Sequence, residues 1–154
     1  MKNEKAVALV TVFLILQLLA LCYMGYILTS TKLILEEYKL LIECITIAGF
    51  GGVLYCLRGV YLNYCVKKQW TNEWIVSYFI RPIVSLICGG VAYLFLKAGL
   101  LILDAKKEID SANLGFLAFA FIAGMNVDKF IWKIEDLAKA TWGIEKSRTN
   151  NNND

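Results

Sequence analysis

The chain has 154 residues, of which 58% are hydrophobic even before glycine is counted, and its formal net charge is only +3. Ordinary soluble domains contain roughly 45–50% apolar residues with glycine included, so this composition excludes a water-soluble globule. Histidine is absent, which removes histidine base catalysis and nearly all zinc-ligand patterns. We therefore expect a membrane protein that is not an enzyme, needs no metal or cofactor, and has no nucleic-acid partner.

Four apolar stretches are long enough, or nearly long enough, to cross a bilayer, which takes about 20 helical residues. They cover residues 6–28, 40–62, 78–103 and 114–126. The fourth is apolar for only about 12 residues, or about 18 Å of helix. The fold class predicted for residues 1–126 is therefore an all-α, polytopic membrane protein with a bundle of four transmembrane helices.

Residues 127–143 carry an apolar stripe at helical spacing, formed by Val127, Phe130, Ile134, Leu137 and Thr141. This pattern predicts an amphipathic helix that emerges from the fourth crossing at the cytoplasmic face. Phe130, Ile134 and Leu137 are its candidate residues for docking a partner. A break at residues 124–126, with Asn126 as the helix cap, and a continuous helix both fit the sequence. Residues 144–154 are polar, and we expect them to be disordered.

Basic residues near the crossings favour one side, which predicts that both termini face the cytoplasm. On that side are Lys2, Lys5, Lys67, Lys68, Lys129, Lys133, Lys139, Lys146 and Arg148. Anionic lipids of the inner leaflet are the expected counter-charge. In the loop between the second and third crossings, Val66, Trp70 and Trp74 are spaced by four, which predicts a short interfacial helix.

Four ionisable residues lie inside the apolar stretches and a fifth, Asp128, lies just after the fourth stretch; charges at such depth are costly and mark candidate functional sites. Counting residues from the ends of the crossings places them in two layers. Glu43 and Lys97 form the outer layer, and Arg58, Arg81 and Asp128 form the inner layer. The layers are interpreted either as basic side chains that reach the lipid phosphates beside hydrated acids, or as buried ion-pair networks.

Pairs of small residues four positions apart predict close helix packing. The pairs are Ala48 with Gly52, Ser85 with Gly89, and Ala120 with Gly124. A pore would have to form between copies of so small a bundle, and its candidate lining residues are Gln17, Glu43 and Asn126.

Three segments together resemble a pattern found in small bacterial inner-membrane proteins. They are Phe79-Ile80-Arg81-Pro82, Ala98-Gly99-Leu100-Leu101, and residues 119–130 with the sequence FAFIAGMNVDKF. The layout of four crossings and a cytoplasmic helix is also similar to that of membrane subunits of bacterial antiphage systems, such as the membrane component of the Kiwa system. This resemblance implies an oligomer that senses a membrane perturbation and signals to a cytosolic effector, with no catalytic residues.

Three classes of function compete at this stage, and a small transporter or enzyme is the least favoured of them, because inverted repeats and catalytic groups are both missing. The first is a homo-oligomeric sensor or scaffold that relays a membrane signal to a cytosolic protein through its C-terminal helix. The alternative is an oligomeric ion channel, holin-like pore or effector that depolarises the membrane.

Overall fold

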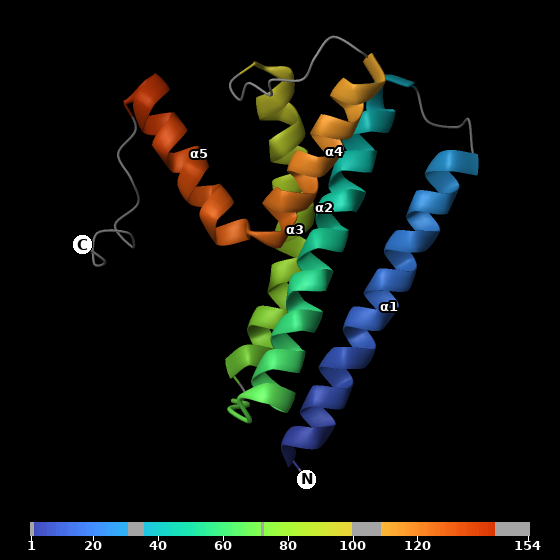
Figure 1. Ribbon diagram of the computed structural model, residues 1–154, viewed down its shortest axis with the longest axis vertical. Helices are drawn as coiled ribbons and strands as arrows, with labels where there is room; N and C mark the ends of the chain where they lie inside the picture. The colour runs from blue at the N-terminus through green and yellow to red at the C-terminus, as the bar shows by residue number, and fades with distance from the viewer. Residues whose placement is uncertain (1, 31–35, 72, 100–108, 144–154) are drawn as a thin grey trace.

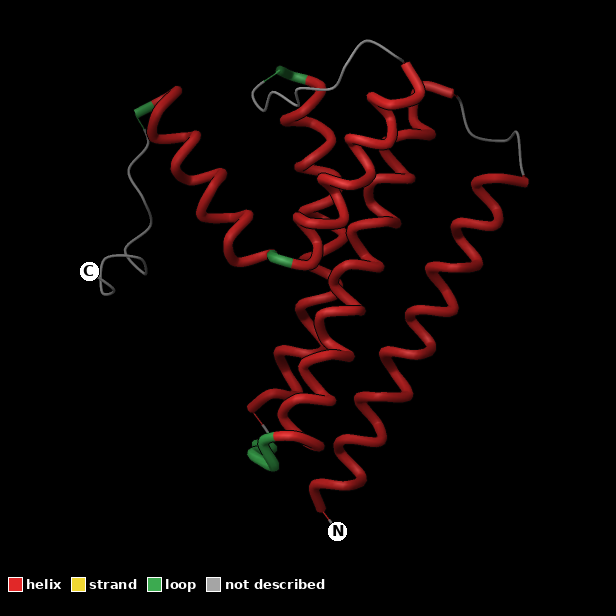
Figure 2. The backbone as a smooth tube through the Cα atoms, viewed as in Figure 1, coloured by secondary structure: helices red, strands yellow, loops and turns green. Residues whose placement is uncertain are grey.

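The computed structural model describes residues 2–30, 36–71, 73–99 and 109–143, in which every regular element is a helix (Figures 1 and 2). In chain order the elements are α1 (Lys2–Ser30), α2 (Glu36–Val60), the π-helix η1 (Tyr61–Val66), α3 (Glu73–Lys97), α4 (Ile109–Met125) and α5 (Val127–Trp142). Three segments are long and apolar enough to span a membrane, Glu4–Leu28, Tyr38–Val66 and Glu73–Lys97, and the bent pair α4–α5 would make a fourth. The described residues are thus all-helical, and the length and composition of these helices suit a membrane protein.

Helices α1 to α4 run alternately up and down, as Figure 1 shows. The end of the bundle where α2 passes into η1 and α3 begins is called the η1 end. The opposite end, where α4 begins, is called the α4 end. Helix α1 packs its buried side, which includes Val10 and Leu14, into a core shared with Val53 and Cys56 of α2. Helices α2, α3 and α4 pack against one another beside it.

The three pairs of small residues meet where α2, α3 and α4 pack. A Cβ atom added at Gly124 would lie 2.7 Å from Ala48 Cα, and one added at Gly52 would collide with the Ser85 side chain. A Cβ atom at Gly89 would lie 2.7 Å from the carbonyl oxygen of Cys44. These distances are shorter than van der Waals contact, so the three backbones approach closely only because glycine stands at these positions.

The interfacial helix predicted from Val66, Trp70 and Trp74 is wrong. The chain leaves η1 through a loop in which Lys68 has a positive φ of 53°, and α3 begins at Glu73. Trp70 is buried, with its ring stacked on that of Tyr78 at a centroid distance of 5.7 Å. The indole is thus buried more fully within the bundle than it would be on the surface of a helix at the interface.

Helix α4 ends at a sharp bend, which we call the elbow. Asn126 separates α4 from α5 with φ −117° and ψ 51°, and the two helix axes differ by 110°. Of the two alternatives for residues 124–126, the break is confirmed and the continuous helix is wrong, and α5 turns back and runs toward the α4 end, away from the bundle (Figure 1). Residues 100–103 of the third predicted crossing and the tail 144–154 lie outside the described residues.

Candidate functional site: the charged elbow and its grooves

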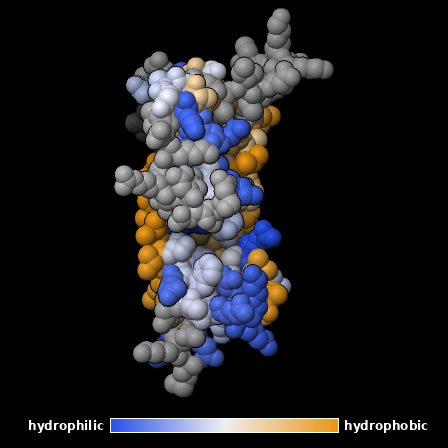
Figure 3. Space-filling view, turned by 90° about the vertical axis from the view of Figure 1, so that its left-hand side faces the viewer, coloured by the Kyte–Doolittle hydropathy of each residue, from blue (hydrophilic) through white to orange (hydrophobic). Residues whose placement is uncertain are grey.

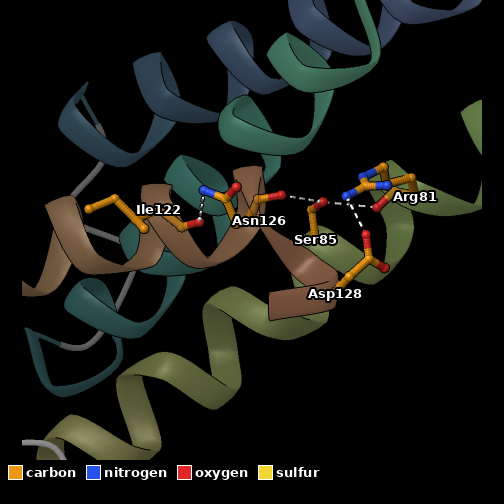
Figure 4. Close-up of polar contacts among 6 residues, drawn as sticks. Arg81, Ser85, Ile122, Asn126 and Asp128 are labelled. Carbon is orange, nitrogen blue, oxygen red and sulfur yellow. Dashed lines mark hydrogen bonds and ion pairs between the residues drawn. The ribbon is translucent and has the colours of Figure 1, made fainter. Parts of the chain in front are cut away.

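An ion pair joins α3 to the elbow. Arg81 Nη2 lies 2.8 Å from Asp128 Oδ2, with the arginine on α3 and the aspartate in the first turn of α5 (Figure 4). An acidic side chain in the first turn of a helix also interacts favourably with the helix dipole. Asp128 is therefore stabilised by two independent sources of positive charge.

The Arg81 guanidinium is held on a second side by an aromatic ring. Its Cζ atom lies 3.9 Å from the ring centroid of Tyr55 on α2, a distance typical of a cation–π contact. Its Nε atom is buried and has no hydrogen-bond partner among the described residues. Arg81 thus connects α2, α3 and α5, and its Nε–H remains available as a donor.

The end of α4 is supported by a hydroxyl group. Ser85 Oγ, which is fully buried, lies 2.9 Å from the carbonyl oxygen of Gly124 and 2.9 Å from that of Arg81 (Figure 4). The last carbonyl groups of a helix have no hydrogen-bond donor within the helix, and the elbow leaves the Gly124 carbonyl in this situation. The Ser85 hydroxyl therefore replaces the backbone N–H that a continuous helix would provide.

Asn126 occupies the N-cap position of α5, but its side chain does not cap the helix. Its side chain makes no capping hydrogen bond, and its Nδ2 donates backward to the carbonyl oxygen of Ile122 at 3.4 Å (Figure 4). The first turn of α5 is fixed by other contacts, namely the ion pair of Asp128 and the packing of Phe130 on Phe119, whose ring centroids lie 5.9 Å apart.

Two grooves lie on either side of Arg81. The basic groove, of about 340 Å³, is lined by ten residues that include Tyr55, Arg58, Lys67, Trp74, Ser77 and Arg81. The elbow groove, of about 240 Å³, is lined by Tyr55, Arg81, Asn126, Asp128, Lys129 and Trp132. Tyr55 and Arg81 border both grooves, so these two side chains form the wall between them.

The structure brings together part of the inner charge layer expected from the sequence. Arg81 and Asp128 of the inner layer are paired, whereas Arg58 lines the basic groove beside Arg81. In the outer layer, Lys97 Nζ donates to the Tyr93 hydroxyl at 3.0 Å. Glu43 and Lys97, which both lie within the described residues, form no ion pair with each other.

The three candidate pore-lining residues are dispersed. Gln17 lies on α1, Glu43 lies on α2, and Asn126 forms the elbow. Only Asn126 lines one of the two grooves.

The face of the molecule that carries α5 gathers hydrophilic side chains, with apolar side chains along both edges (Figure 3).

The candidate docking residues of α5 are divided between two environments. Phe130 is buried, and Ile134 packs against the same cluster. Leu137 lies farther along α5 and is half-buried. The large apolar side chains that α5 exposes are Ile131, Trp132 and Trp142.

Sequence reasoning missed Tyr55 and assigned Lys67 only to the count of basic residues. A signal for Tyr55 was present, because it lies one helical turn before Arg58 and so on the same face of α2.

Within residues 2–30, 36–71, 73–99 and 109–143, no three Cys, Asp or Glu side chains are close enough to hold a metal ion. Comparisons of the chain with protein-family models, with curated proteins and with solved structures found no match.

Proposed function

We propose that this chain is a homo-oligomeric sensor or scaffold of the bacterial inner membrane, with the η1 end at the cytoplasmic face, and that α5 is its output. The observation that carries the proposal is the attachment of α5 to the bundle through its first turn. Its buried residues, Val127 and Phe130, both belong to its first turn, and one ion pair fixes that turn to α3. The rest of α5 extends away from the bundle.

In this proposal α5 has two positions. The position seen here is the retracted one, in which Arg81 holds Asp128 and α5 folds back beside the bundle. Release of Asp128 would let α5 swing toward the cytoplasm and present Ile131 and Trp132 to a soluble protein. A single ion pair of modest strength suits such a switch, because a ligand can shift only an equilibrium between states of similar free energy.

Two further considerations support a sensor. The layout resembles that of antiphage membrane subunits, for which the resemblance implies a signal relayed to a cytosolic effector. The alternative of a pore gains no such support, because Gln17, Glu43 and Asn126 are dispersed over the structure.

The test measures the exposure of α5 to the cytoplasm. Ala140, which is exposed on α5, is replaced by cysteine in a chain whose exposed cysteines, Cys22 and Cys65, are changed to serine. Inverted membrane vesicles are then treated with a membrane-impermeant maleimide. We expect labelling to increase several-fold when Asp128→Asn is added, because the ion pair is lost, and to stay unchanged with the neighbouring variant Lys129→Gln.

Two results would contradict the proposal. The first is equal labelling in the chain with Asp128 and in the Asp128→Asn variant. The second is rapid depolarisation of the membrane, measured with a potential-sensitive dye, when the chain is expressed alone, because this would indicate a pore. A protein that remains monomeric in lipid nanodiscs would remove the homo-oligomeric part.

A further inference from the structure

We propose that the basic groove binds a phosphate group with net negative charge, supplied by the headgroup of an anionic lipid in the cytoplasmic leaflet. The inference rests on the proposed function for the placement of the η1 end at the cytoplasmic face and adds a ligand to it. Its chemical content comes from the groove itself.

The charge of the groove is the first argument. Arg58, Lys67 and Arg81 line it, and none of the described residues that line it is acidic. Asp128 neutralises Arg81 from the other side of the wall, whereas Arg58 and Lys67 form no ion pair within the described part of the chain. Two uncompensated positive charges therefore face one cavity, an arrangement that attracts an anion.

The donors of the groove are the second argument. The Ser77 and Tyr78 side chains line the cavity together with the three basic residues. Asn63 Nδ2 donates to the Tyr78 hydroxyl at 3.0 Å, which leaves the hydroxyl proton of Tyr78 for another acceptor. Guanidinium, ammonium and hydroxyl donors around one cavity match the several oxygen acceptors of a phosphate group.

The size and position of the groove are the third argument. About 340 Å³ is near the lower end of small-molecule sites, which cover roughly 300–1,000 Å³, so the groove suits a headgroup rather than a whole lipid. Trp74, half-exposed at its rim, is a residue type enriched at the level of lipid headgroups. A phosphate at this position would be reached from the membrane surface.

The shared wall gives this ligand a route to α5. Arg81 borders the basic groove and also holds Asp128 in the elbow groove. A bound phosphate would compete with Asp128 for the guanidinium, whose Nε proton is unused among the described residues.

The experiment measures lipid binding directly. Phosphatidylglycerol or zwitterionic phosphatidylcholine is titrated into the full chain purified in a neutral detergent, and bound lipid is counted by native mass spectrometry. We expect phosphatidylglycerol to bind more tightly than phosphatidylcholine. The groove variant, Arg58→Gln with Lys67→Gln, should weaken phosphatidylglycerol binding at least about tenfold, which corresponds to a loss of roughly 1.4 kcal/mol of binding free energy. A charge-preserving variant, Arg58→Lys with Lys67→Arg, should retain most of the binding.

A matched control removes the same charge elsewhere. Lys133→Gln with Lys139→Gln changes two exposed lysines of α5 that do not line the groove, and we expect an affinity within about twofold of the unmodified chain. The inference is overturned if the groove variant binds phosphatidylglycerol like the unmodified chain, or if the control loses as much affinity. Because both pairs are exposed, unchanged circular dichroism should show that each variant is folded.

A second arm identifies the source of the phosphate. Inorganic phosphate and glycerol 3-phosphate are added at millimolar concentration as competitors. Failure to displace phosphatidylglycerol supports a lipid headgroup. Displacement from the unmodified chain retains the phosphate site but assigns it to a soluble phosphate compound, which overturns the lipid as its source. Loss of lipid binding leaves the labelling test of α5 unaffected, so the two proposals fail separately.

Discussion

Arg81 Nη2 and Asp128 Oδ2 lie 2.8 Å apart although the two residues are separated by 47 positions in the chain. The contact fixes the first turn of α5 to the middle of the bundle. It also involves Arg81, which together with Tyr55 separates the two grooves. It is therefore the point at which a change in either groove can affect the direction of α5.

The strength of this ion pair can be measured by a double-mutant cycle. We expect Asp128→Asn and Arg81→Gln to have effects on the free energy of unfolding that are not additive, with a coupling energy of about 1 kcal/mol, because Asp128 is 72% exposed and exposed pairs contribute little. The measurement is the thermal unfolding of the two single variants and the double variant in one detergent.

Asp128→Glu is the conservative control for the cycle, since it keeps the carboxylate within reach of Arg81. It should retain most of the stability that Asp128→Asn loses. Strict additivity of the two single variants would show that the contact contributes nothing measurable.

The sequence predicted the inner charge layer because depth along a helix follows from counting residues. Arg81 and Asp128 were placed at one level, and the structure pairs them. The same counting placed Glu43 and Lys97 together, but these two described residues form no ion pair with each other. Depth is set by the rise of a helix, whereas pairing also requires that the two side chains point toward each other, which depends on how each helix is rotated about its axis.

The elbow and the loop after η1 show what the sequence pattern could not determine. The spacing of apolar residues predicts α5 as a helix, but its direction depends on the backbone of Asn126 and on the packing of Phe130 against Phe119. Trp70 fits an interfacial helix by its spacing, yet its ring is buried against Tyr78. In both places a packing contact between side chains of different elements overrides a local preference.

The glycine contacts predict a position-specific effect of adding one methyl group. Gly124→Ala should destabilise the bundle by about 1–3 kcal/mol or prevent folding, because its Cβ atom would meet the backbone of Ala48. Gly25→Ala is the matched control, since no atom lies within 4 Å of a Cβ added there. The fraction of protein that elutes as a folded species in size-exclusion chromatography checks both, and equal yields would contradict the close packing of α2 and α4.

The two environments of tryptophan give another prediction. Trp70 is 9% exposed and contacts the rings of Tyr64 and Tyr78, whereas Trp142 is 60% exposed at the end of α5. Trp70→Ala should lower the free energy of unfolding by about 3–5 kcal/mol, as for other large buried side chains. Trp142→Ala should change it by less than about 0.5 kcal/mol. Similar melting temperatures for the two variants would show that Trp70 is not part of the packed core.

The orientation of the chain can be tested with a cysteine that is already present. Cys65 is exposed in η1, close to Lys67 and Lys68 at the η1 end. If this end faces the cytoplasm, a membrane-impermeant maleimide should label Cys65 in inverted membrane vesicles and leave it unlabelled in intact cells whose outer membrane has been permeabilised. The Cys65→Ser variant gives the background. Cys22, exposed on α1, is present in both proteins, so any labelling of it belongs to the background that the Cys65→Ser variant measures. Labelling of Cys65 from the outside would reverse the proposed orientation and place the basic groove in the outer leaflet.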